Sequence, residues 1–303
     1  MVKQKSTLPI VALALASILW GLNTPFIKMG VASIPVPIFM SIRFLIASLI
    51  ILPFAIRDWR PLKRKDFLLL TLSSIFFISL SAVALNVGLS KTTALNAAVI
   101  WLLGPLLLFI LSASYLKERL SFKTFIGIVV ALAGSLIIIG KPWQAGASGL
   151  ASLSGNLLVV VSVFCQTISI LIAKPLMKKV STYQATFMSL FPGIVPVALY
   201  ALTQLPSWNI HATTHKSYQG LIYSTVAVVI ANFLFFYALH YKKAQDTGVY
   251  QYLDTVAAIA GAWFLLSERP SSKLELGTIL VFAGIYLAEV HLPRKVALSK
   301  PNG

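Results

Sequence analysis

The stretch LKERLSFKTFIGIVVALAG, residues Leu116–Gly134, decides the fold because it returns 150 positions later as LSERPSSKLELGTILVFAG, residues Leu266–Gly284. Of these 19 aligned positions 8 are identical, among them a Glu-Arg pair and two glycines. The match extends without a gap from 94–139 onto 244–289. Each copy has an apolar run, a short charged turn and a second apolar run, which predicts a helical hairpin in a membrane.

Composition points the same way. The chain is 58% hydrophobic and only 11% charged, whereas a soluble domain carries about 25% charged residues. The net charge of +17 does not indicate nucleic-acid binding, because the cations lie in short clusters between apolar runs rather than on one folded face. The single cysteine, Cys165, has no partner for an internal disulfide or a metal site. The sequence therefore predicts an all-α, polytopic membrane protein.

Ten runs are long and apolar enough to cross a membrane, since a spanning helix needs about 20 residues. The first is longer than the core of a typical signal peptide and belongs to the first repeat, so we interpret it as a true span. No segment between the runs is long enough for a separate soluble domain. The ten runs are 8–29, 37–56, 67–89, 94–115, 121–139, 152–173, 183–204, 219–240, 244–266 and 274–290.

Orientation is predicted from the Lys and Arg residues in alternate loops. With the N-terminus in the cytoplasm, 18 of the 25 cations fall on the cytoplasmic side, 6 fall outside and Arg43 lies within a span. Both termini are therefore expected in the cytoplasm. A five-helix repeat also makes the second half enter the membrane inverted, and such inverted repeats are typical of secondary transporters. We assign 1–142 to the first repeat, 150–292 to the second and 293–303 to a cytoplasmic tail.

Several short patterns resemble the EamA family of the drug/metabolite transporter superfamily. They include SILWGLNTPFIK at Ser17–Lys28 and Arg43-Phe44 in the second span. Other matching positions are spread over both halves: Asn96, Pro105, Glu118, Gly127, Gly134, Leu253-Asp254, Glu268, Gly277 and Gly284. One departure is Thr255, which stands where the family usually has a proline matching Pro105. The resemblance therefore does not by itself imply a hinge in that span.

The resemblance implies ten spans and proton- or gradient-linked movement of small metabolites, often export of amino acids. Such a protein would lie in the cell (inner) membrane. The resemblance implies no cofactor and no catalytic residue, and a small-molecule substrate with the lipid bilayer as partners. It does not distinguish a monomer from a homodimer, or import from export.

Two charged residues within the spans are candidates for substrate binding. Asp254 lies near the middle of the ninth span, where a charged carboxylate costs roughly 2.5–3.5 kcal/mol on insertion scales. It is expected to bind a substrate ammonium, to carry a coupling proton, or to stabilise helix packing as a neutral acid. Arg43 lies about five residues from the outer end of the second span. It pairs either with a substrate carboxylate or Asp254, or with lipid phosphate and backbone carbonyls.

Polar and aromatic side chains within apolar helices are further candidates, although such groups often only hydrogen-bond between helices. The candidate substrate-binding set besides Arg43 and Asp254 is Trp20, Asn23, Asn96, Trp101, Tyr237 and Gln251. Asn86, Gln166 and Asn232 belong to the same class of residue. The Gly104-Pro105 pair is the candidate hinge, because it interrupts backbone hydrogen bonding in the fourth span.

The repeated turns and small residues have plainer explanations. Glu118 and Glu268 are expected to cap helices or pair with nearby cations. The glycines of the fifth and tenth spans form small-residue faces that allow close packing, either within the chain or at a dimer seam. His211 and His215 lie four residues apart without a third ligand, so we predict no metal site.

The predicted function is a secondary transporter that exports small metabolites such as amino acids by alternating access between the two inverted repeats. A multidrug or cation efflux transporter of the same fold is the alternative. An intramembrane enzyme is the alternative from another class. The chain carries no H-E-x-x-H, Gly-x-Ser-x-Gly or P-loop motif and only 8 carboxylates, which disfavours an enzyme and excludes a pump with its own nucleotide-binding domain.

Overall fold

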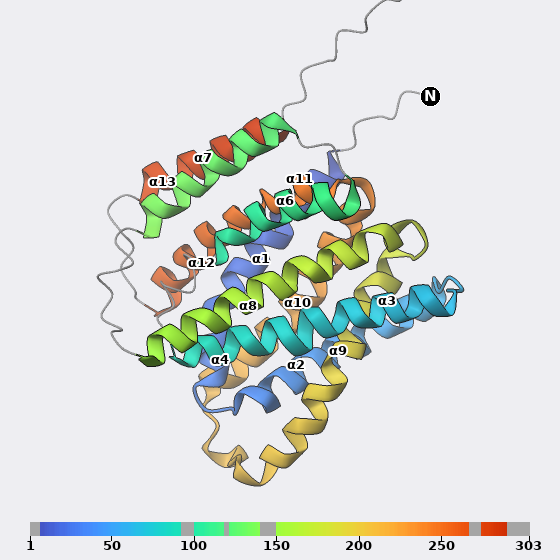
Figure 1. The fold of residues 1–303 in the computed structure, drawn as a ribbon. Coiled ribbons are helices and arrows are strands. Elements are labelled where there is room, and N and C mark those ends of the chain that lie inside the picture. The colour runs from blue at the N-terminus through green and yellow to red at the C-terminus, as the bar shows by residue number, and fades with distance from the viewer. Residues whose placement is uncertain (1–6, 92–99, 118–120, 140–149, 267–273, 290–303) are drawn as a thin grey trace, which may run out of the picture.

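The computed structural model describes residues 7–91, 100–117, 121–139, 150–266 and 274–289, and the elements within these ranges are helices (Figure 1). The helices of the first half are α1 (Leu8–Val31), α2 (Val36–Arg57), α3 (Arg64–Ser74), η1 (Ile75–Ala82), α4 (Val83–Lys91), α6 (Leu103–Leu116) and α7 (Phe122–Ile139). Those of the second half are α8 (Leu150–Ala173), η3 (Lys174–Lys178), α9 (Thr182–Gln204), α10 (His215–Tyr241), α11 (Ala244–Gly248), α12 (Gln251–Leu266) and α13 (Leu274–Glu289). Two 3₁₀ turns, η4 (Leu205–Ser207) and η5 (Ile210–Ala212), separate α9 from α10.

Six of these helical stretches are long and apolar enough to cross a membrane, within the part of the chain that the structure describes. They correspond to the first, second, third, sixth, seventh and eighth predicted spans. Three shorter apolar helices lie at the predicted fourth, fifth and tenth spans. The prediction of an all-helical, multi-span chain therefore agrees with the structure, whereas the count of ten spans stays a prediction.

Helices of one half pack mainly against helices of the other half. Helix α1 lies against α10 and α12, and α8 lies against the α3–η1–α4 rod (Figure 1). Helices α2 and α9 run antiparallel, because Phe54 near the end of α2 stacks on Tyr183 near the start of α9. At the other end of the pair, Phe39 shares a buried cluster with Ala201. The buried core therefore lies between the two halves.

The α7–α13 pair lies at one side of the bundle (Figure 1), and its glycines bring the two helix backbones close together. A Cβ atom added at Gly127 would lie 2.5 Å from the Gly284 carbonyl oxygen, and one added at Gly284 would lie 2.5 Å from the Gly127 oxygen. A Cβ at Gly134 would lie 2.6 Å from the Gly277 oxygen. The two small-residue faces thus meet inside one chain, in antiparallel order.

Helix α9 is opened at Gly193 by a side chain from α3. The Ser74 hydroxyl donates to the Ser189 carbonyl at 2.8 Å and accepts from the Gly193 amide at 2.8 Å. It therefore occupies the place of the hydrogen bond that would join these two residues within α9. Pro192 and Pro196 also remove backbone donors from this helix. Insertion of a side chain into the helical ladder is a recognised cause of a kink.

Candidate functional site

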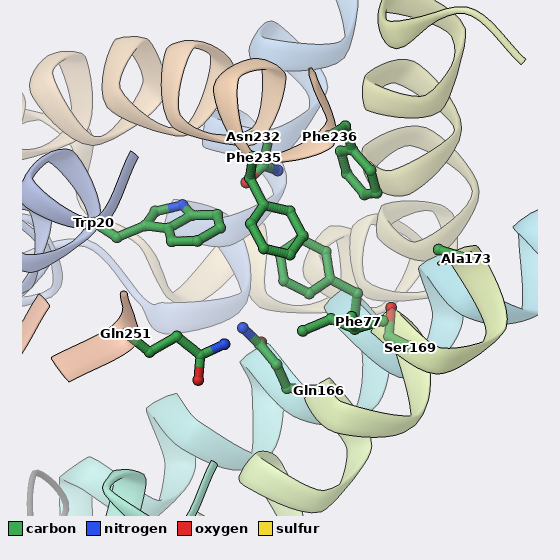
Figure 2. A pocket seen from close by; sticks show the side chains of 10 residues that line it. Trp20, Phe77, Gln166, Ser169, Ala173, Asn232, Phe235, Phe236 and Gln251 are labelled. Atoms are coloured by element: carbon green, nitrogen blue, oxygen red, sulfur yellow. The ribbon is translucent and has the colours of Figure 1, made fainter. Parts of the chain in front are cut away.

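A pocket lies between the halves, where side chains from five helical segments converge (Figure 2). Helix α1 and the π-helix η1 contribute from the first half, and α8, α10 and α12 contribute from the second. Its volume is about 10 Å³, room for about one water molecule. The lining residues are Trp20, Phe77, Gln166, Ser169, Ile170, Ala173, Asn232, Phe235, Phe236 and Gln251.

Two broken helices lie beside this pocket. A turn at Leu102 precedes α6, so Gly104 and Pro105 lie in the first turn of that helix. In the ninth predicted span a turn at Val249 and Tyr250 separates α11 from α12. From the sequence, the candidate hinge is Gly104-Pro105, and Thr255 in place of the usual proline leaves the ninth span without an implied hinge. The first break lies directly before the Gly-Pro pair, and the second lies in the ninth span, before Thr255.

The two breaks are joined by a hydrogen bond between residues 150 positions apart. The Tyr252 hydroxyl donates to the Leu102 carbonyl at 3.3 Å, and both residues are buried. A broken helix within a membrane needs such a partner, because its freed backbone groups have no water to bond. The missing proline at Thr255 therefore does not prevent a break, since the interruption lies before α12 and a side chain satisfies a freed carbonyl at the opposite break.

Gly104 lets the second broken helix approach the first. A Cβ atom at this position would lie 3.1 Å from Gln251 Oε1 and 3.7 Å from a Val163 methyl group. Gln251 begins α12 directly after the break, and its amide points into the pocket (Figure 2). The small residue in α6 therefore leaves the space in which this pocket side chain lies.

The π-helix η1 places Phe77 in the pocket wall. Such wide turns are rare and often lie at functional sites. Serines of the same rod fasten it to α8: Ser73 donates to the Ser169 carbonyl at 2.9 Å, and the Ser81 and Ser162 hydroxyls lie 3.0 Å apart. Ser81 also lies 3.5 Å from Gln166 Oε1 and donates toward it.

Asn232 is the pocket residue with the least satisfied side chain. It is 1% exposed, and both its Nδ2 and its Oδ1 are buried without a hydrogen-bond partner in the part of the chain that the structure describes. A buried unpaired amide normally costs about 1–3 kcal/mol for each group. Asn232 lies one turn before Phe235 and Phe236, which line the same pocket. In the sequence, Asn232 is one of several polar residues within apolar helices, and nothing local distinguishes it from the others.

Two of the predicted substrate-binding residues line the pocket, namely Trp20 and Gln251. The Trp20 ring lies 5.3 Å from the Phe235 ring, centroid to centroid. Tyr237 was predicted on the same helix as Asn232 but lies outside the lining, where its ring contacts Tyr241 at 5.2 Å. On α10, the face that reaches the pocket carries positions 232, 235 and 236, and a single sequence does not show which face that is.

Asp254 and Asn23 lie beside the pocket rather than in its lining. A Cβ atom at Gly21 would lie 2.8 Å from Asp254 Oδ1, so this carboxylate packs on the α1 backbone next to Trp20. Asp254 is partly exposed and follows Gln251 by about one helical turn. Asn23 is buried, and its Oδ1 finds no hydrogen-bond partner among the described residues.

Arg43 lies elsewhere and is already engaged. It is 6% exposed, its Nε donates to the Ser224 carbonyl at 3.2 Å, and its guanidinium carbon lies 4.7 Å from the centroid of the Phe44 ring. It therefore connects α2 to α10 in the arrangement described. Trp101 lies directly before the turn at Leu102 and outside the lining. Asn96, Glu118 and Glu268 fall outside the described residues.

The chemistry that this lining offers is that of amides and aromatic rings. Three carboxamides, one indole and three phenyl rings surround the pocket. The lining contains no Asp, Glu, His or Cys among the described residues, so it lacks the usual ligands for a transition metal.

Comparison with known proteins identifies the chain. The model of the EamA-like transporter family matches residues 7–140 and again residues 153–289. The chain belongs to the EamA family. Both matches together span nearly all of the described helices, so this EamA protein is a multi-pass membrane protein of a transporter family.

Relatives of this EamA protein come from bacteria and archaea. The uncharacterized transporter YetK of Bacillus subtilis is 29% identical over 287 residues, which cover 92% of this chain and 86% of YetK. An uncharacterized transporter of Archaeoglobus fulgidus is 28% identical over 278 residues, covering 91% of this chain and 97% of the relative. One crystal structure shares the fold with a TM-score of 0.74 at 17% identity, over 93% of this chain and 96% of the other.

Proposed function

We propose that this protein is a secondary transporter that moves a small metabolite by alternating access between two inverted halves. The observation that carries the proposal is the pocket, which is lined by α1 and η1 from the first half and by α8, α10 and α12 from the second. Substrate sites between inverted repeats, near discontinuous helices, are typical of such transporters.

Inversion of the halves is supported by the family matches and by helix direction. The family model covers two consecutive parts of the chain, 7–140 and 153–289. Helices α7 and α13 each end one of these parts and pack antiparallel through Gly127 and Gly284. Helices α2 and α9, the second of each part, are antiparallel as well. Equivalent helices that run in opposite directions are expected from a two-fold axis within the membrane plane.

The small pocket volume favours a moving site. A space of about 10 Å³ holds about one water molecule, so a metabolite enters only when helices separate. The helix breaks at Leu102 and at Val249-Tyr250 lie beside the pocket and are the proposed hinges. Asp254, one turn beyond Gln251, is the proposed carrier of a coupling proton. We expect Asp254→Asn to abolish or uncouple transport while the protein still folds in detergent.

We propose a location in the cell membrane with both termini in the cytoplasm, on the distribution of 18 of 25 cations to one side. Export is the proposed direction, because the resemblance to this family implies it. Amino acids as cargo would need Arg43 or Asp254 to reach the substrate, and neither lines the pocket.

A multidrug or cation efflux transporter is the second candidate. The aromatic rings of Trp20, Phe77, Phe235 and Phe236 in one pocket favour it, because aromatic faces attract organic cations. Transport of hydrophobic cations into proteoliposomes would support this candidate over metabolite transport.

Access to the pocket from the two membrane sides tests the proposed mechanism without knowledge of the substrate. Ser169→Cys, in a Cys165→Ala background, places one thiol at the pocket. A charged, membrane-impermeant methanethiosulfonate added to one side reports access from that side. Ser112→Cys is the matched control, because Ser112 is 0% exposed and lies outside the lining. We expect labelling of Ser169→Cys from either side and no labelling of the control.

A disulfide that links the two halves distinguishes a carrier mechanism from a passive channel. The Ser33 and Ser217 hydroxyl oxygens lie 2.8 Å apart, between the α1–α2 connection and α10. A disulfide in Ser33→Cys/Ser217→Cys should block labelling from that end and speed labelling from the other, because it shifts the population to the opposite state. A channel would lose labelling at one end with no gain at the other, and that result would reject alternating access.

A further inference from the structure

The side chains at the pocket carry no charge. None of the described residues that line it is Asp, Glu, Lys, Arg or His. Of the two charged groups discussed within the spans, Arg43 bonds the Ser224 carbonyl away from the pocket, and Asp254 lies beside the pocket but packs against α1 at Gly21 instead of lining it. A carboxylate or an ammonium that entered this pocket would lose its water without gaining an opposite charge, which is costly.

The carboxamide of Asn232 offers a hydrogen-bond donor beside an acceptor at the pocket. Its donor Nδ2 and acceptor Oδ1 are both buried and unpaired among the described residues. A carboxamide matches another amide-type group best, because each side offers one donor beside one acceptor. A solute with a lactam or carboxamide edge would satisfy both atoms at once.

Gln166 and Gln251 add polar groups on the opposite side. Figure 2 shows their amide ends pointing toward each other, with Trp20 above Gln251 and Phe77 and Phe235 beside the open space. Ser81 donates toward Gln166 Oε1, which leaves the Gln166 amide nitrogen as a donor toward the pocket. The arrangement therefore combines donors and acceptors with aromatic walls.

We propose that the pocket selects an uncharged, planar heterocycle that carries a lactam or carboxamide edge. The edge pairs with Asn232, the glutamine amides bind further polar atoms, and the ring packs against the aromatic side chains. This assignment rests on the proposed transport function and names the substrate class of the same site. It differs from the amino acids and the cationic drugs considered from the sequence.

Three compounds of nearly the same shape and different charge test the selection. They are nicotinamide, which is neutral, nicotinate, which is an anion, and 1-methylnicotinamide, which is a cation. Binding to the purified full-length protein is measured by isothermal titration calorimetry, with uracil and its carboxylate orotate as a second neutral and anionic pair. We expect each neutral compound to bind at least tenfold more tightly than its charged counterpart.

An Asn232→Leu variant separates a binding role from a structural one. Leucine has the same branched shape with the same number of side-chain heavy atoms, and it removes two unpaired polar atoms, so we expect the variant to unfold at the same or a higher temperature. The same variant should bind the neutral compounds at least tenfold more weakly. Asn86→Leu is the matched control, because the Asn86 amide bonds the Ala82 carbonyl at 2.8 Å outside the pocket, and its binding should stay unchanged.

Several outcomes would overturn the assignment. Tighter binding of nicotinate or orotate would indicate an anion site, and tighter binding of 1-methylnicotinamide would indicate a cation site. A less stable Asn232→Leu protein with unchanged affinity would make Asn232 structural. Failure of every neutral compound to bind at millimolar concentration would also reject the heterocycle. The proposed alternating access is tested separately by thiol labelling, so either idea can fail alone.

Discussion

The α7–α13 pair and the region around the pocket differ in how their helix backbones are packed and hydrogen-bonded. In the α7–α13 pair, regular helices touch through Gly127, Gly134 and Gly284. Gly127 and Gly284 each lie close to the carbonyl oxygen of the other. Around the pocket, the π-helix η1 and the turns at Leu102 and Val249-Tyr250 interrupt regular hydrogen bonding. The first region is a continuous contact between regular helices. The second combines interruptions held by side chains with a close contact of α1 and α12 at Gly21.

The difference indicates which helices can move relative to one another at a low cost in free energy. Close backbone contacts between two regular helices resist separation, because any sliding brings carbonyl oxygens against neighbouring atoms. An interrupted helix instead depends on single hydrogen bonds, such as Tyr252 to the Leu102 carbonyl. Breaking one such bond costs much less than repacking a helix pair. We therefore infer that α7 and α13 move together and that the pocket changes shape around them.

Adding one methyl group to the close pair should have the largest effect. In Gly127→Ala the new Cβ would lie 2.5 Å from the Gly284 carbonyl oxygen, so the backbone must move. We expect a loss of about 1–3 kcal/mol, typical of overpacking, although alanine favours a helix by up to about 1 kcal/mol over glycine. Thermal unfolding in detergent measures the change.

Gly104→Ala is the matched control for that experiment. Its Cβ would lie 3.1 Å from Gln251 Oε1, which is the movable end of a side chain. The unfolding temperature should stay near that of the unchanged protein while solute binding falls, because the amide is displaced within the pocket. Equal destabilisation by both alanines would remove the distinction between the two regions.

Ser74→Ala tests the hydroxyl inserted in α9. We expect a loss of about 1 kcal/mol, because the Ser189 carbonyl and the Gly193 amide both lose their partner. Ser114→Ala is the control, since Ser114 is exposed and its hydroxyl bonds the Ile110 carbonyl of its own helix. An unchanged unfolding temperature in Ser74→Ala would mean that the Gly193 amide bonds the Ser189 carbonyl directly, with no loss of stability.

Tyr252→Phe tests the bond between the two helix breaks. Hydrogen bonds between helices in a membrane average about 0.6 kcal/mol, so we expect a small loss of stability. The rate at which the thiol of Ser169→Cys is labelled should change more clearly, because the bond joins the proposed hinges. Tyr286→Phe is the control, as Tyr286 is 69% exposed. Identical labelling rates in the two variants would argue against a hinge role.

The ion pair between Lys179 and Asp66 should have the smallest effect. Its nitrogen and oxygen lie 2.7 Å apart, and Lys179 is 51% exposed, so its interaction energy is about 0.2–1 kcal/mol. A double-mutant cycle with Lys179→Gln and Asp66→Asn measures the coupling, which should fall as salt is added. A coupling that does not depend on salt would show that the pair is less exposed to water than described.

Much of this architecture follows from local sequence. Apolar runs of about 20 residues require helices in a membrane, since no water is available for unpaired backbone groups. The repeat from Leu116 to Gly134 and again from Leu266 to Gly284 indicates two related halves and close glycine packing. The structure places those glycines at the α7–α13 contact. Trp20 and Gln251, two residues that the sequence singled out, lie at the pocket.

What only the tertiary structure decided is which polar groups meet. Asn232, Gln166 and Phe77 reach the pocket because of helix rotation and a π-turn, and neither is visible in a run of apolar letters. Arg43 is conspicuous in the sequence, yet its partners are the Ser224 carbonyl and the Phe44 ring. The sequence alone determined two membrane-embedded halves, because burial of backbone is a local requirement. The uncharged pocket between them depends on long-range packing, which no single helix specifies.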